Sequence, residues 1–189
     1  FDVSAGTRFG LAGLTLSDGS ATDDGGGIRN AGEMELADVT ITDCLAVGRG
    51  AGIYSTGMLT IEDSLITQNA TTGSSSSHGA GIFSAGPLEM HTVEVSSNIA
   101  RGDTGGIYAA GGIVADNLTL ELNFSYGNTG GLLVSGGAIN LTDSLVGQNL
   151  GTTGAGGISI SGGTGGSIID TVFDRNEALG GSGGGLALS

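Results

Sequence analysis

Several residue types are scarce or absent in this chain of 189 residues, and each absence excludes a class of protein. One cysteine cannot form an internal disulfide, so the chain is not a disulfide-stapled scaffold. Lysine is absent, and five arginines face 19 acidic residues, for a net charge of −14. Grooves for nucleic acid and surfaces for anionic membranes both need clustered cations, so we expect neither partner.

Long apolar runs are also missing, and none approaches the roughly 20 residues that a membrane-spanning helix needs. Glycine is abundant instead, with 40 residues, yet 38% of the chain is hydrophobic, which is too much for a disordered linker. The glycines have no strict three-residue spacing, so a collagen helix is excluded. The composition therefore indicates a fold that uses many glycines at turns and still buries a core.

An internal repeat organises the chain. Its first landmark is a Gly-Gly-Ile type motif that ends on a large aliphatic anchor residue. The anchors are Ile28, Ile53, Ile82, Ile107, Leu132, Ile158 and Leu186, at intervals of 25 to 29 residues. Extrapolation backwards puts Val3 at the anchor of a first unit. The chain therefore reads as about seven copies of a unit of about 25 residues, plus the start of an eighth.

A second landmark lies about 16 residues after each anchor and is mostly asparagine. Its members are Cys44, Asn69, Asn98, Asn123, Asn149 and Asn176. An asparagine side chain offers one acceptor and two donors. If the repeats stack, each amide can bond to the amides above and below, and we predict an internal asparagine ladder along the molecule. Cys44 would be a small buried thiol in a ladder slot; we assign it no redox or metal role.

Within a unit the hydrophobic period is two rather than 3.6. In the unit that begins at Ile53, three short strands are expected, at Ile53–Ser55, Leu59–Ile61 and Ser64–Thr67. Because the glycine density disfavours helices, three strands per 25 residues fit one coil of a parallel β-solenoid. We predict an all-β parallel β-helix with one domain over residues 1–189, either a fragment of a longer chain or a processed subunit.

These landmarks resemble the polymorphic outer-membrane-protein type of repeat, marked by Gly-Gly-Ala-Ile and Phe-x-x-Asn. The run Phe173-Asp174-Arg175-Asn176 followed by Gly183-Gly184-Gly185-Leu186 carries both marks in order. The resemblance covers nearly the whole chain. It implies a right-handed parallel β-helix of the pectate-lyase-like superfamily and a bacterial cell-surface setting, and it implies little about function.

No catalytic constellation is visible. Pectin-cleaving relatives on this fold use clustered Asp residues with Arg or Lys, whereas the arginines of this chain are spread over several coils, at Arg8, Arg29, Arg49, Arg101 and Arg175. His78 is expected in a solvated loop, and His91 on an outward or corner position without a partner. We therefore predict a protein that is not an enzyme and needs no cofactor.

Calcium needs separate treatment, because one corner column is rich in Asp and Asn. It contains Asp38, Asp63, Thr92, Asn117, Asp143 and Asp170. Carboxylates stacked one coil apart repel each other, and a Ca²⁺ ion between them would relieve that repulsion. Alternatively, these side chains cap tight corners by accepting hydrogen bonds from backbone N–H groups. The sequence leaves both interpretations open.

An outward column carries an aromatic stripe of Tyr54, Phe83 and Tyr108. Stacked rings on adjacent coils can support a sheet, and they can also receive a sugar ring or a partner surface. The stripe is therefore both a candidate support and a candidate contact surface.

The function expected from these features is that of a non-catalytic structural or adhesive rod, outside the cell or on its surface. The first and last units show no capping segment, so we expect either flanking coils or end-to-end self-association into a filament. The alternative is a β-helix that binds or cleaves carbohydrate, such as surface glycans. That alternative requires a cluster of Asp and Arg on one outer face, which the spacing does not reveal.

Overall fold

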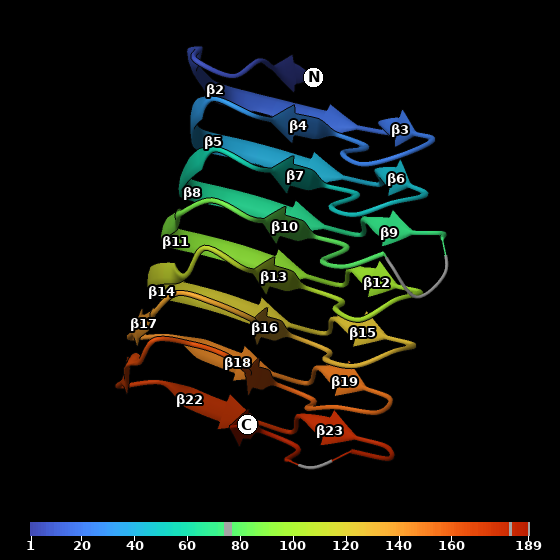
Figure 1. Ribbon diagram of the computed structural model, residues 1–189, viewed down its shortest axis with the longest axis vertical. Coiled ribbons are helices and arrows are strands. Elements are labelled where there is room, and N and C mark those ends of the chain that lie inside the picture. The colour runs from blue at the N-terminus through green and yellow to red at the C-terminus, as the bar shows by residue number, and fades with distance from the viewer. Residues whose placement is uncertain (74–76, 182, 189) are drawn as a thin grey trace.

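A computed structural model describes residues 1–73, 77–181 and 183–188 as a stack of coils held together by three parallel sheets. Each sheet runs along the axis of the stack, and its strands come from successive coils (Figure 1). Within the described residues there is no helix, and so none that could cross a membrane. The chain is a β-solenoid of about seven turns, as the repeat predicts.

The three sheets are named A, B and C, in the order in which one coil visits them. Sheet A contains β1 (Asp2–Val3), β4 (Ile28–Asn30), β7 (Ile53–Ser55), β10 (Ile82–Ser84), β13 (Ile107–Ala109), β16 (Leu132–Val134), β20 (Ile158–Ile160) and β24 (Leu186–Leu188). Sheet B contains β2 (Arg8–Ser17), β5 (Glu33–Thr42), β8 (Met58–Thr67), β11 (Leu88–Ser96), β14 (Ile113–Glu121), β17 (Ile139–Thr142), β18 (Leu145–Gly147), β21 (Gly166–Ile169) and β22 (Val172–Asp174). Sheet C contains β3 (Ser20–Ala21), β6 (Leu45–Ala46), β9 (Ala70–Thr71), β12 (Ile99–Ala100), β15 (Phe124–Ser125), β19 (Leu150–Gly151) and β23 (Glu177–Ala178).

The predicted anchors pair with one another in sheet A. Ile28 is opposite Ile53, and the column continues through Ile82, Ile107, Leu132, Ile158 and Leu186. The first unit differs from the prediction, because Val3 pairs with Asn30 rather than with Ile28. The two-residue shift preserves the alternation of the strand, so Val3 still points inward and is buried.

The expected division of the coil into strands is partly wrong. Leu59–Ile61 and Ser64–Thr67 belong to one strand, β8, which bends at Asp63, where φ is 45°. A second bend follows at Gln68, where φ is 57°, and then the two-residue strand β9 of sheet C. Single residues in the left-handed conformation thus make both corners, without the separate turn that the sequence pattern indicated.

Aliphatic columns fill the space between the sheets. Fully buried members include Ile53, Leu59, Ile61 and Ile66, and each lies above its equivalent in the next coil. At the first coil the same columns reach solvent: Phe9 continues the column of Met34 but is 41% exposed. At the other end Leu188, in the column of Ile160, is 72% exposed. The core is therefore a continuous rod of side chains that is uncovered at both ends.

Candidate functional site

The asparagine column lies inside the second corner, between sheets B and C. The side-chain amide Nδ2 of Asn69 donates to Oδ1 of Asn98 at 3.0 Å, and the same bond at 3.0 Å joins Asn98 to Asn123, Asn123 to Asn149 and Asn149 to Asn176. Each Oδ1 also accepts the backbone N–H of the preceding ladder residue, and each Nδ2 also donates to a carbonyl such as that of Ile66. These asparagines therefore bond along the stack and hold the corner backbone at the same time.

The ladder explains most of the recurring glycines, because the residue before the anchor packs directly against a ladder amide in five coils, at Gly52, Gly81, Gly106, Gly131 and Gly157. A Cβ atom added to Gly81 would lie 3.0 Å from Nδ2 of Asn98 and 2.9 Å from the carbonyl oxygen of Gly106. Gly52 is in the same relation to Asn69. The two sequence landmarks are thus two sides of one contact, and a side chain larger than hydrogen at the glycine would displace the amide.

Cys44 occupies the ladder slot of the second coil and is fully buried. Its backbone N–H donates to Oδ1 of Asn69 at 3.0 Å, so it ends the column of amides. Burial raises the pKa of its thiol, which keeps the sulfur protonated and poorly nucleophilic. The geometry is that of a small side chain filling a corner.

The aromatic stripe lies on the outer face of sheet A. The rings of Tyr54 and Phe83 stack with centroids 5.2 Å apart, and those of Phe83 and Tyr108 with centroids 5.1 Å apart. Yet Tyr54 is only 9% exposed and Phe83 only 5%. Loop side chains cover the rings, so little of their surface is open to a ligand, and the geometry favours the supporting role.

Arg49 is one of these covering side chains. Its guanidinium carbon is 4.7 Å from the ring centroid of Phe83 and 5.0 Å from that of Tyr54. Nη2 of Arg49 donates to Oδ2 of Asp24 at 2.9 Å, and the backbone N–H of Arg49 donates to Oδ1 at 2.7 Å. This bond to Asp24 raises the pKa of Arg49. The pair joins two neighbouring coils. Both carboxylate oxygens of Asp24 accept hydrogen bonds from Arg49, so the carboxylate is engaged in the structure rather than available for catalysis.

His78 covers the next part of the stripe, and its expected place in a solvated loop is wrong. Its ring stacks on Tyr108 with centroids 5.0 Å apart, and its Nδ1 lies 3.2 Å from Oδ2 of Asp103. Burial lowers the pKa of His78; the charge of Asp103 opposes this effect and the charge of Arg49 adds to it. The three loop residues Arg49, His78 and Asp103 come from three coils, which is why single-unit reasoning missed their convergence.

The Asp/Asn column forms the bend of sheet B. All six members have positive φ, between 45° and 54°, and all are exposed. Four of them, Asp38, Asp63, Thr92 and Asn117, line an open groove of about 410 Å³, with Thr40, Leu65 and Glu94 among its other residues. The nearby backbone N–H groups of Val39 and Leu118 bond to Ser64 and Ser144 of the next coil rather than to the Asx side chains. Asp and Asn are therefore favoured here because they tolerate the left-handed conformation.

No group of three or more His, Cys, Asp or Glu side chains within the described ranges is placed to hold a metal ion. The column thus has a backbone explanation that needs no cation, and calcium binding stays a prediction.

Sequence analysis missed sheet C altogether, because the residues after each ladder position look like the start of a glycine-rich loop. The signal that would have revealed it is the residue that directly follows each ladder residue. These residues are Leu45, Ala70, Ile99, Phe124 and Leu150, and they pair in register along the outside of sheet C.

Comparisons with protein families, with curated proteins and with solved structures find no match to this chain. The arrangement of strands therefore defines the class, a parallel β-solenoid, and the resemblance to outer-membrane-protein repeats and to pectate-lyase-like β-helices remains a prediction.

Proposed function

We propose that this protein is a non-catalytic structural rod of the cell surface or extracellular space, which extends when further β-solenoid coils stack on its ends. The observation that carries the proposal is the coil-to-coil bonding, which continues without interruption from Cys44 to Asn176. Such a ladder transmits the same geometry from one coil to the next and gives a straight, stiff body.

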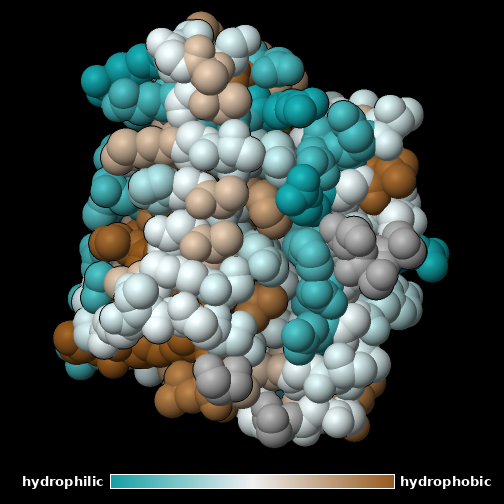
Figure 2. All heavy atoms as spheres, viewed as in Figure 1, coloured by the Kyte–Doolittle hydropathy of each residue, from teal (hydrophilic) through white to brown (hydrophobic). Residues whose placement is uncertain are grey.

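The two end faces support stacking because they present incomplete structure. Strands β2 and β3 at one end pair on one side only, as do β23 and β24 at the other. Leu186 and Leu188 border an apolar hollow of about 330 Å³ at the C-terminal face, and Figure 2 shows hydrophobic side chains gathered at that end. Unpaired strand edges and uncovered core residues both favour addition of another coil. A further coil of the same polypeptide would pair these strand edges and cover these core residues in the same way as a second copy.

Other features agree with a rod rather than an enzyme. The Asp24–Arg49 pair and the aromatic stripe are internally satisfied, and their role in the structure is to fasten loops over sheet A. A net charge of −14 keeps the protein soluble, which suits a crowded surface setting. An adhesive role or contact with surface glycans would use the lateral face.

End-to-end stacking is tested on the 189-residue chain by negative-stain electron microscopy and sedimentation velocity over a range of concentrations. We expect particles that lengthen in steps of roughly 35 Å, seven coils at about 4.8 Å each. Phe9→Asp or Leu188→Asp should shorten them, because each places a charge on one end face. Particles of a single length at every concentration would contradict self-stacking.

A further inference from the structure

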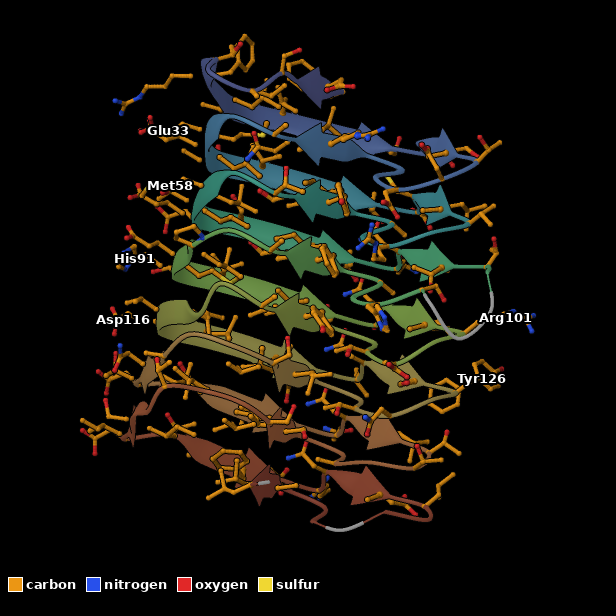
Figure 3. The ribbon with its side chains drawn as sticks, viewed as in Figure 1. Glu33, Met58, His91, Arg101, Asp116 and Tyr126 are labelled. Carbon is orange, nitrogen blue, oxygen red and sulfur yellow. The ribbon has the colours of Figure 1, made fainter. Side chains whose placement is uncertain are left out.

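Sheet C forms a narrow ridge along one side of the rod, opposite the side that carries Glu33, Met58, His91 and Asp116 (Figure 3). We define the ridge by two outward rows. The first row is Ser20, Leu45, Ala70, Ile99, Phe124, Leu150 and Glu177, paired in register along sheet C. The second row lies two residues further along each coil and is Thr22, Val47, Thr72, Arg101, Tyr126, Thr152 and Leu179.

The ridge gathers the apolar side chains that the rest of the lateral surface lacks. Among the residues that the structure describes, fourteen large hydrophobic ones are exposed, and seven of these are in the two end regions of the stack. Of the other seven, Leu45, Val47, Ile99 and Tyr126 are on the ridge, and Leu122 borders it at the second corner. Only Met58 and Val114 lie elsewhere. Exposed apolar side chains concentrated in this way are typical of an interaction surface.

The ridge also differs from the rest of the molecule in charge. Its two rows hold one positive residue, Arg101, and one negative residue, Glu177, so they are neutral together, whereas the chain carries −14. Two copies that approached through any acidic face would repel each other. The ridge is a lateral surface through which they can meet with little of that repulsion.

The order of side chains along the first row is self-complementary about its middle member, Ile99. An antiparallel second copy, related by a two-fold axis at Ile99, brings the bulky Phe124 against the small Ala70 and brings Leu150 against Leu45. In the second row Tyr126 meets Thr72 in the same way. Arg101 would approach its own mate, but it is exposed, and its guanidinium lies over Tyr126, 5.8 Å from the ring centroid.

We propose that two copies of this chain pack side by side and antiparallel through the ridge. The interface is isologous, as closed homodimers require. It uses a surface separate from the end faces, so it does not depend on end-to-end stacking, and a rod could do both.

The first test replaces Ile99, which is 43% exposed at the centre of the ridge, by aspartate. The matched control is Val114→Asp, an outward strand residue of sheet B that is 45% exposed. Sedimentation velocity of the 189-residue chain should show a dimer that Ile99→Asp weakens at least tenfold and Val114→Asp leaves unchanged. Circular dichroism of both variants verifies that each keeps its β-structure.

The second test fixes the direction of packing by cysteine cross-linking, with the buried Cys44 as an inert background. Ile99→Cys should form a disulfide-linked dimer by itself, because the residue lies on the two-fold axis. Leu45→Cys should cross-link only when mixed with Leu150→Cys.

Two outcomes overturn the proposal. One is a wild-type chain that stays monomeric, or whose association is equally sensitive to Ile99→Asp and Val114→Asp. The other is association that increases particle length without width and responds to Leu188→Asp alone, a result that supports end-to-end stacking and removes the lateral dimer.

Discussion

The side-chain amide of Asn98 donates a hydrogen bond of 3.0 Å to the side-chain oxygen of Asn123, which is the same atom that accepts the backbone N–H of Asn98. One oxygen thereby holds both the side chain and the main chain of the coil before it. Repeated at each step, this contact makes every corner dependent on the next coil. The stack should therefore lose stability steeply when one amide is removed.

Asn98→Ala is expected to lower the free energy of unfolding by about 2 to 5 kcal/mol, because it leaves buried donors and acceptors on Asn69 and Ile66 without partners. Urea unfolding followed by circular dichroism measures the change. Asn140→Ala, on the partly exposed outer row of sheet B, is the matched control and should cost far less. Equal losses in the two variants would mean that the ladder asparagine contributes no more to stability than an asparagine on the outer surface.

The recurrence of Gly-Gly-Ile and Asn was enough to predict the solenoid and the stacking of its anchors. This succeeded because side chains one coil apart share the same environment, so a required residue type recurs with the coil period. Gly81 and Asn98 recur together because they are in contact. The register of the first coil was less visible, since Val3 has a partner on one side only.

What the sequence did not reveal is contact between loops of different coils. Arg49, His78 and Asp103 come together over the aromatic rings, and each lies four residues before its anchor, but the residue type changes from coil to coil, so no repeated residue marks the column. The Asp63 column was expected to form a corner, but the way in which the chain turns at Asp63 and Gln68 was not visible, because a single left-handed residue makes each bend without a glycine or proline to mark it. The strands of sheet C have two residues each, which is too few for the alternation of inward and outward side chains to be recognised in the sequence.

Thr92 sits in the left-handed corner column with φ of 54°, a conformation that a β-branched side chain adopts at a cost. Thr92→Asn is therefore expected to raise the free energy of unfolding by about 1 kcal/mol. Thr119→Asn, within the extended strand β14 of the same sheet, should not stabilise. Urea unfolding of both variants decides, and a destabilised Thr92→Asn would contradict the assignment of this column to backbone conformation.

Thr104 lies in the segment that connects β12 to β13 and is fully buried, and its hydroxyl has no hydrogen-bond partner among the residues described. Thr104→Val replaces that hydroxyl by a methyl group of similar size, so it should raise stability by up to about 1 kcal/mol. Ser125→Ala is the contrasting variant, because its hydroxyl donates to the carbonyl of Gly102 at 2.7 Å and accepts the N–H of Gly127. Thermal melts should move in opposite directions for the two.

Stability should also depend on pH through His78. Its pKa is lowered from 6.5 in the folded protein by burial, against the attraction of Asp103 and with the repulsion of Arg49. The unfolded chain then binds a proton more readily than the folded one between these two pKa values. The contribution of neutral His78 to stability is therefore complete above about pH 6.5 and is lost as the pH falls toward the lowered value.

His78→Phe retains an aromatic ring to stack on Tyr108 but cannot take up a proton. The free energy of unfolding, measured in urea between pH 7.5 and pH 5, should fall less for this variant than for the wild type. His91→Gln, on the exposed outer row of sheet B, should retain the wild-type difference between the two pH values. An equal loss of stability on acidification in His78→Phe and the wild type would mean that other groups carry the whole pH dependence. The assignment of a stabilising neutral histidine to this loop would then be wrong.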